Sequence, residues 1–442
     1  MTETYDLIIR GGTIVNHDGT GKADIGVRDG RTAFIGDLAR ADAGEVVDAT
    51  GLHVLPGVID SQVHFREPGA EHKENLEAGM AGAALGGVTA IFEMPNTKPS
   101  TTTPEAIQDK LDRAQGRAAV DHAFYVGAAA ENTPELAELE MLPGVAGVKI
   151  FMGASTGSLL VSDDPSVLAV LQNGRRRVAV HCEDEPRMNA REDLRVTGDP
   201  SSHPVWRDAE SAIRATTRLL ALARQAGRRI HVLHVTTAEE MILLAANKDI
   251  ATVETTPQHL TLAAEEAYPA LGTLAQMNPP IRDAAHRAGL WRGLGQGVVD
   301  VIGSDHAPHT LDEKAKPYPA SPSGMPGVQT LVPIMLDHVN AGRLSLTRFM
   351  DLTSAGPARV FGLAGKGRLA SGFDADFTLV DMQRTQTITN AQMANVSGWT
   401  PFHGKSVTGW PVMTLVRGHT VMRDGGLTGL KPGQPIRFQE CL

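Results

Sequence analysis

Short apolar runs alternate with amphipathic stretches through the middle of the chain. The runs are rich in Val, Ile and Ala, which is typical of parallel strands buried on both faces. Helix-like segments such as 103–115 and 210–226 separate them, so this region reads as a series of βα units. The expected strands are 53–59, 88–94, 120–126, 148–152, 178–181, 230–235, 251–255 and 298–303.

Eight consecutive βα units predict an α/β protein built on a (β/α)₈ TIM-like barrel with long loops. A doubly wound open sheet is the main structural alternative. The chain has no GxGxxG after a strand and no GxxxxGK[ST], so a nucleotide site of either type has no support.

Both ends of the chain show a different pattern, with short strands separated by turn residues. LIIRGGTIVNHDG near the start and TLVRGHTVMRDG near the end share a strand, Arg-Gly, Thr, a second strand and Asp-Gly. We expect the two termini to form one small β-sandwich domain from residues 1–52 and 363–442, with the barrel at 53–362. The alternative is two unrelated hairpins.

Composition narrows the class of protein. The 442 residues carry a formal net charge of −10, which argues against a nucleic-acid partner because wrapping a phosphate backbone needs a basic face. Two cysteines, Cys182 and Cys441, favour a reducing cytosol over a disulfide framework. Neither a secretion signal nor a long apolar stretch is evident, so we expect a cytoplasmic protein without a membrane span.

Polar, metal-competent side chains stand where five of the expected strands end. In a barrel enzyme these ends meet at one mouth, where chemistry takes place. A single buried histidine would usually be structural, but five such groups without partners would be costly to bury. Shared divalent cations such as Zn²⁺ would offset that cost. The residues are His64, Lys149, His181, His234 and Asp305.

Spacing and chemistry refine three of these positions. Gln62 and His64 are two residues apart, so both point to the same side of an extended strand. Lys149 would act as a ligand only if its amine had reacted with carbon dioxide to form a carbamate; the plainer interpretation is a salt-bridged lysine. Asp305 can accept a proton from an attacking water, although an aspartate there can also cap a helix.

The motifs together resemble the amidohydrolase superfamily, and within it the dihydroorotases. The resemblance covers nearly the whole chain. It is carried by PGVIDSQVHFREPG from Pro56, EMPNT from Glu93, GVKIFM from Gly147, HCED from His181, HVLH from His231, MNPP from Met277, SDHAPH from Ser304 and DAD from Asp374.

The resemblance implies reversible hydrolysis of dihydroorotate to N-carbamoyl-L-aspartate with one or two Zn²⁺ ions. His181 and His234 would bind one metal, His64 and Asp305 the other, with N6-carboxylated Lys149 between them and Asp305 as the catalytic base. One position departs from the pattern, since Gln62 stands where the superfamily usually has histidine. An amide oxygen is the weaker ligand, which puts one metal position in question.

The substrate is expected to be a small anionic cyclic amide. Arg66 follows His64 by two residues, and its planar guanidinium suits a carboxylate. By resemblance, Asn96 and His309 join Arg66, and Asn278 contacts the ring. Residues 310–327, rich in Pro, Gly and Ser, are expected to form a lid.

Two alternatives remain open. The first is another cyclic amidase, of the allantoinase or hydantoinase type, which would share the barrel and ligands. The second is a low-activity subunit that supports aspartate transcarbamoylase, for which Gln62 is the only sequence support. A homodimer or homotetramer is expected by analogy with other barrel enzymes.

Overall fold

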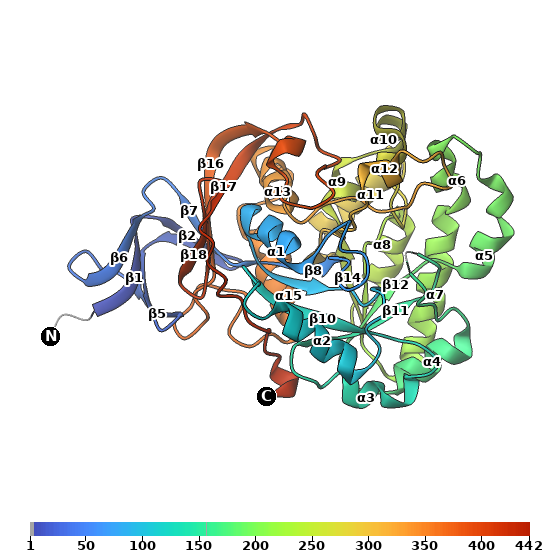
Figure 1. Ribbon diagram of the computed structural model, residues 1–442, viewed down its shortest axis with the longest axis horizontal. Helices are drawn as coiled ribbons and strands as arrows, with labels where there is room; N and C mark the ends of the chain where they lie inside the picture. The colour runs from blue at the N-terminus through green and yellow to red at the C-terminus, as the bar shows by residue number, and fades with distance from the viewer. Residues whose placement is uncertain (1–3, 156) are drawn as a thin grey trace.

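Eight parallel strands form the centre of the computed structural model, which describes residues 4–155 and 157–442 (Figure 1). Each strand pairs with the next one in sequence. A parallel bridge between Val63 and His306 joins the last strand region to the first, and His64 N donates to His306 O at 2.7 Å. The expected barrel is confirmed. Its strands are β8 (Val58–Val63), β9 (Val88–Glu93), β10 (Asp121–Gly127), β11 (Val145–Phe151), β12 (Val178–His181), β13 (Ile230–Val232), β14 (Ala251–Thr255) and β15 (Val301–Ile302).

The first expected strand, 53–59, is wrong as a single element. The chain forms two strands there, β7 (His53–Pro56) and β8, and β7 pairs with the β-sheet built from the chain ends. The break falls at Gly57, whose N–H donates to Asp376 O at 2.9 Å. A Cβ at Gly57 would lie 2.2 Å from Thr89 Oγ1, so only glycine allows this close passage.

Helices cover the outside of the barrel, and most of the long ones begin at a polar cap. The side chains of Asn75, Thr103, Asp163, Asp208 and Asp283 each accept a hydrogen bond from a backbone N–H of the first helical turn. The helices that follow the strands are α1 (Leu76–Leu85), α2 (Pro104–Ala114), α3 (Leu136–Leu139), α4 (Asp164–Gln172), α7 (Ala209–Ala226), α8 (Ala238–Ala245), α11 (Ala284–Gly295) and α13 (Leu331–Asn340).

Further short helices lie in the loops and after the barrel. They are α5 (Glu185–Ala190), α6 (His203–Trp206), α9 (Pro257–Thr261), α10 (Ala264–Leu271), α12 (Leu311–Lys314), α14 (Leu346–Met350) and α15 (Gly356–Phe361). None of the helices in the described residues has the length and apolar character needed to cross a bilayer.

The two chain ends meet in a β-sandwich beside the barrel, at the left of Figure 1. One sheet has the order β5-β4-β1-β6, and the other has the order β19-β18-β17-β16-β7-β2-β3. Leu7 and Ile25 of the first sheet share a buried cluster with Phe377 and Leu415 of the second. The strands are β1 (Thr4–Arg10), β2 (Thr13–Asn16), β3 (Gly19–Lys22), β4 (Asp24–Arg28), β5 (Arg31–Gly36), β6 (Asp42–Asp48), β16 (Phe377–Thr387), β17 (Ser406–Val416), β18 (His419–Arg423) and β19 (Gly426–Leu427).

The two similar terminal segments fold differently. At the end of the chain, β17 and β18 form an antiparallel hairpin, whereas β1 and β2 near the start lie in different sheets. The second sheet packs on the barrel helices, since Thr414 Oγ1 donates to Ala84 O at 2.7 Å and Asn340 Nδ2 donates to Thr408 O at 2.7 Å.

The interior of the barrel is packed, and aromatic side chains close its amino end. Every residue of β8 to β13 is buried. Aromatic side chains fill the amino end, where Phe92 lies 5.1 Å from Phe361 and 5.9 Å from Phe438 between ring centroids.

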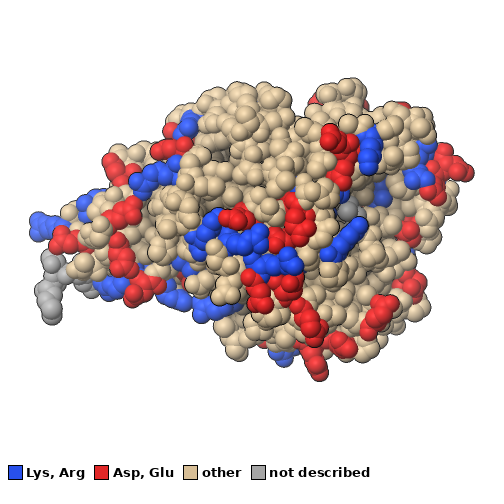
Figure 2. All heavy atoms as spheres, viewed as in Figure 1, with Lys and Arg blue, Asp and Glu red and all other residues tan. Residues whose placement is uncertain are grey.

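On the surface seen in Figure 2, basic and acidic side chains are intermingled and form no continuous basic face.

Candidate active site

A cavity opens at the carboxyl ends of the barrel strands, where the polar residues of the sequence motifs converge. It is lined by all six predicted metal-site residues and by three of the four predicted substrate contacts. Arg66 and Asn96 also line a second, wider cavity of about 550 Å³. The lining residues are Gln62, His64, Arg66, Asn96, Lys149, Phe151, Ser155, His181, His234, Asn278, Asp305, Ala307, Ser323 and Gly324.

Two histidines from neighbouring strands form one half of the site. His181 Nδ1 lies 3.0 Å from His234 Nε2, and His181 Nε2 lies 3.0 Å from Glu183 Oε2. Glu183 is in turn held by Arg207, whose Nε donates to it at 3.1 Å. Burial lowers the pKa of both histidines, so two neutral imidazole rings face each other across the site.

His64, Asp305 and Gln62 form the other half. His64 Nδ1 lies 2.7 Å from Asn96 Oδ1, which makes Nδ1 the donor and directs the Nε2 lone pair at Asp305 Oδ1, 3.2 Å away. Gln62 Nε2 donates to the same carboxylate oxygen at 2.9 Å, while Gln62 Oε1 has no partner. Burial raises the pKa of Asp305 to about 7.

Lys149 lies between the two halves without a hydrogen-bond partner for its Nζ. The ammonium lies 4.3 Å from the centroid of the Phe151 ring, and the residue is 1% exposed. Burial lowers the pKa of Lys149 to about 7, so a substantial fraction is neutral amine at neutral pH. The salt-bridge alternative for this lysine therefore does not hold in the described chain.

Three residues of the site have strained backbone conformations. Arg66, His234 and Asp305 have φ values of 60°, 36° and 46°, which side chains other than glycine rarely adopt. Each follows shortly after the end of a strand, where the chain turns so that the side chain projects into the mouth of the barrel. Strain of this kind persists only where the surrounding structure fixes it.

Arg66 is buried, yet no carboxylate of the described chain lies within 4 Å of its guanidinium. Its Nε donates to Pro308 O at 3.3 Å, and His309 Nε2 lies 3.4 Å from its Nη2. Burial lowers the pKa of Arg66 to about 10, so the group remains cationic at neutral pH. The outer wall of the site thus holds a positive charge that no protein group pairs.

His309 does not line the cavity, unlike the other predicted substrate contacts. Its Nε2 lies 3.0 Å from Ser323 O, and its Nδ1 lies 3.1 Å from Lys73 Nζ. With both ring nitrogens engaged, the side chain lies behind Arg66 and helps to fix it.

Two residues outside the predicted set hold site residues in place. His203 is buried, and its Nε2 lies 2.9 Å from Asn278 Oδ1. Glu183 lies beside His181. The HCED motif contained the signal for Glu183, but His203 is 75 positions away from Asn278 and no local pattern indicates the pairing.

The segment expected to form a lid is held together by a buried lysine of its own, which also bonds to the loop at Gln276. Lys314 is fully buried, and its Nζ donates to the carbonyl oxygens of Gln276, Pro322 and Gly324. These bonds place Gly324 in the cavity wall. A Cβ there would lie 2.4 Å from Ala307 O, so glycine brings the backbone against the site.

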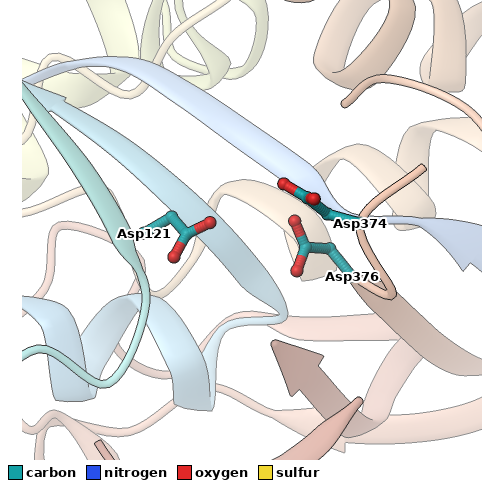
Figure 3. Close-up of side chains that lie close together, drawn as sticks. All are labelled: Asp121, Asp374 and Asp376. Carbon is teal, nitrogen blue, oxygen red and sulfur yellow. The ribbon is translucent and has the colours of Figure 1, made fainter. Parts of the chain in front are cut away.

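A second buried cluster lies at the opposite, amino end of the barrel. The carboxylates of Asp121, Asp374 and Asp376 face one another closely enough to hold a metal ion (Figure 3). Lys366 Nζ already lies among them, 2.5 Å from Asp121 and Asp376 and 3.2 Å from Asp374. Arg417 Nη2 donates to Asp121 at 2.9 Å. This junction between barrel and sandwich is therefore an internal salt-bridge network.

Comparison with known proteins finds relatives that match nearly the whole chain. The amidohydrolase family profile matches residues 53–421. A dihydroorotase of Halobacterium salinarum is 39% identical over 399 residues, covering 88% of this chain and 91% of that protein. An allantoinase of Escherichia coli K12 is 35% identical, covering 95% of each chain. The solved L-hydantoinase of Arthrobacter aurescens superposes with a TM-score of 0.93 at 31% identity, covering 98% and 99%.

Proposed function

Because this chain belongs to the amidohydrolase family and is a metal-dependent cyclic amidohydrolase, we propose that its substrate is dihydroorotate. The reaction is reversible hydrolysis to N-carbamoyl-L-aspartate, a step of pyrimidine synthesis. The relatives named dihydroorotase support this choice among cyclic amides.

The observation that carries the proposal is the unpaired charge of Arg66. A buried guanidinium without a carboxylate is costly, and a ligand that brings a carboxylate offsets that cost. The planar group can bind a carboxylate through two parallel hydrogen bonds. Hydantoin and allantoin carry no carboxylate, whereas dihydroorotate does. In this proposal Asn96 borders the same subsite, Asn278 contacts the ring, and His309 positions Arg66.

The residues present fit a metal. Ligands around a tetrahedral Zn²⁺ at about 2.0–2.1 Å lie roughly 3.3 Å apart, close to the 3.0 Å and 3.2 Å separations of the two site pairs. A cation between the two atoms of each pair would replace these hydrogen bonds, with the ring nitrogens and the carboxylate oxygen as its ligands. We propose that His181 and His234 hold one Zn²⁺, and that His64 and Asp305 hold a second, weaker one because Gln62 Nε2 already occupies the carboxylate.

We propose that Lys149 is N6-carboxylated. Its amine is buried, partnerless and partly neutral, which are the conditions under which it can react with carbon dioxide. The product would be an anion between the two halves of the site, whose only other carboxylate among the predicted metal-site residues is Asp305.

The chain's own residues account for the proton movements. A divalent cation held in the site would supply Lewis acidity and lower the pKa of an attacking water. Asp305 accepts the proton of that water as the new C–O bond forms, and returns it to the ring nitrogen as the amide C–N bond breaks. Arg66 holds the substrate carboxylate and fixes the ring over Asp305. The narrow cavity limits the entry of other water molecules.

The experiment is a substrate panel of dihydroorotate, allantoin and hydantoin, each measured with the metal content of the same sample. We expect dihydroorotate to have the highest kcat/KM. A preference for either neutral ring would contradict the proposal.

Arg66→Met separates the carboxylate role from a structural one. We expect kcat/KM for dihydroorotate to fall by about 10–100-fold, as for loss of a hydrogen bond to a charged group, with little change for a neutral hydantoin. Equal losses on both substrates would contradict the assignment. Arg113→Met, in a half-exposed arginine outside the cavity, is the control.

Two other functions are distinguished by the same data. The allantoinase and hydantoinase relatives cover this chain as fully as the dihydroorotases do, so the panel is decisive. A low-activity subunit that supports aspartate transcarbamoylase would bind metal poorly and turn over none of the three substrates.

We further propose that the protein is cytoplasmic and forms a homodimer or homotetramer.

A further inference from the structure

A second polar cavity lies at the amino end of the barrel, on the side opposite the active site. It has a volume of about 190 Å³ and lies beside the starts of β12 and β13. The end of α15 and the C-terminal residues close its other side. Its lining consists of Ala146, Arg176, Arg177, Arg229, Arg359, Val360, Phe361, Gly362, Gln439 and Glu440.

The cavity carries an excess of positive charge. Four arginines line it against one carboxylate, Glu440. Arg229 Nη2 donates a long hydrogen bond to Glu440 Oε1 at 3.4 Å, and Arg176 Nε lies 3.6 Å from Glu440 Oε2, beyond hydrogen-bond distance. Arg359 pairs with Asp351 at 3.2 Å, outside the lining. Four lining guanidinium groups thus face two carboxylates, of which Asp351 is shared with Arg348.

Arg177 is the residue on which this excess rests. Its Nη1 donates to Ile230 O at 2.8 Å and its Nε donates to Val360 O at 3.3 Å, so the group is held in place. The described chain gives its Nη2 no acceptor and gives the side chain no carboxylate within 4 Å. Asp300, a nearby carboxylate, is paired with Lys248.

The barrel itself fixes this arrangement. Arg177 and Arg229 directly precede β12 and β13, two paired neighbours of the sheet, so their backbones lie side by side. Arg176 is 2% exposed, stacks 4.4 Å from the Phe438 ring, and donates to Val145 O at 2.7 Å and Ala146 O at 3.0 Å. The Arg176 Nη donors are therefore taken by backbone carbonyls, and Arg177 Nη2 and the exposed Arg229 supply the guanidinium donors that a phosphate group requires.

We propose that this cavity is a binding site for a phosphate group, carried either by inorganic phosphate or by a phosphate monoester. A dianion neutralises the charge that Glu440 and Asp351 leave unpaired. Arg177 and Arg229 contact the phosphate oxygens, and Arg359 lies at the rim.

Glu440 competes with the ligand for the same arginines. It belongs to the C-terminal turn Gln439–Cys441, which is tied to the barrel through Gln439 N and Gly362 O at 2.7 Å. Its side chain is 38% exposed, so it can swing into solvent when phosphate binds. Removing this charge should therefore tighten binding.

The test measures binding of inorganic phosphate to the full-length metal-loaded protein by calorimetry at constant ionic strength. We expect Arg177→Gln to raise the Kd at least about 10-fold and Glu440→Gln to lower it. Arg214→Gln, an exposed arginine paired with Glu210 on α7, is the matched control and should leave the Kd unchanged. A nucleoside 5′-monophosphate, with the uncharged nucleoside as its control, distinguishes the two sources of the phosphate group.

Two outcomes would overturn the proposal. The first is the absence of binding for both phosphate and monophosphate at millimolar concentration. The second is binding that survives Arg177→Gln but is lost in Arg66→Met, which would place the anion in the active site. Thermal unfolding without ligand shows whether each variant is folded. Arg359→Gln, an exposed change at the rim, provides a second reading if Arg177→Gln is unstable.

Discussion

The two ends of the barrel each hold a buried cluster of charged residues, but only one cluster is internally paired. At the amino end, Lys366 and Arg417 meet the carboxylates of Asp121, Asp374 and Asp376. At the carboxyl end, Lys149 Nζ and Gln62 Oε1 have no partner, and Arg66 has no carboxylate.

This difference teaches that residue type and proximity do not identify a functional site. The three aspartates have the geometry expected of a metal site, yet the Lys366 ammonium forms ion pairs with all three and hydrogen bonds with Asp121 and Asp376, although the Asp374 oxygens have no hydrogen-bond partner. The active site contains a single carboxylate among its six predicted metal-site residues, and its partnerless atoms indicate ligands that come from outside the chain. Whether each buried charge is already paired is therefore the more useful criterion.

The largest expected effect separates chemistry from stability. Asp305→Asn should lower kcat by about 10²–10⁴-fold, because it removes the proton acceptor. Asp376→Asn should leave kcat of the folded protein nearly unchanged and lower its unfolding temperature. Steady-state kinetics and thermal unfolding of both variants test the contrast. A comparable loss of kcat in the two variants would contradict the contrast between the catalytic and the structural cluster.

Lys366→Met should lower the free energy of unfolding by about 3–5 kcal/mol, since it leaves buried carboxylates without their main counter-charge. Urea denaturation measures the change in stability. We expect kcat to stay near the wild-type value, and added Zn²⁺ or Mg²⁺ should leave it unchanged. A variant as stable as the parent would show that the network is not structural.

Acid should lower the free energy of unfolding because His203, near the active site, is neutral in the folded protein. Burial, with a smaller contribution from Arg207, lowers the pKa of this histidine to about 3, so the folded protein keeps it neutral while the unfolded chain protonates near pH 6.5. Stability therefore falls as pH drops from about 6.5, by up to about 1.4 kcal/mol for each pH unit. Urea denaturation at pH 7 and 5 should show a smaller pH dependence in His203→Gln. An unchanged dependence would rule out this contribution.

The smallest effect is expected at the edge of the junction. Arg31 is 45% exposed and lies 3.7 Å from Asp374, so Arg31→Ala should cost no more than about 1 kcal/mol. Its comparison with Lys366→Met measures how strongly burial determines the value of a charge pair. A loss as large as that of the lysine variant would show that Asp374 depends on the surface arginine.

Much of the barrel could be predicted because its strands are continuous apolar runs. The bounds expected for β12 and β14 match those observed. The first strand could not be predicted, because its break at Gly57 depends on Asp376, which lies far away in the sequence and pairs with Gly57 only in the folded chain.

The active site shows the same difference between local motifs, which can be predicted, and contacts between distant segments, which cannot. Its ligand residues follow strand ends, and local motifs reveal them. Ser323 and Gly324 reach the cavity only because Lys314 binds the backbone of a loop, and His203 reaches Asn278 from a separate segment. Contacts of this kind come from tertiary packing, which spacing along the chain does not contain.

The sandwich shared by both termini has a consequence for the order of events on the ribosome. Asn16 Nδ2, at the end of β2, donates to Leu369 O, 353 positions later, so the sheet that contains β2, β3 and β7 cannot be completed until almost the whole chain has emerged. At about 5–20 residues per second, that interval lasts roughly 20–70 s. During this time the nascent N-terminal strands have exposed edges, which a chaperone can shield. The fold can be completed only when the C-terminal strands have left the ribosome.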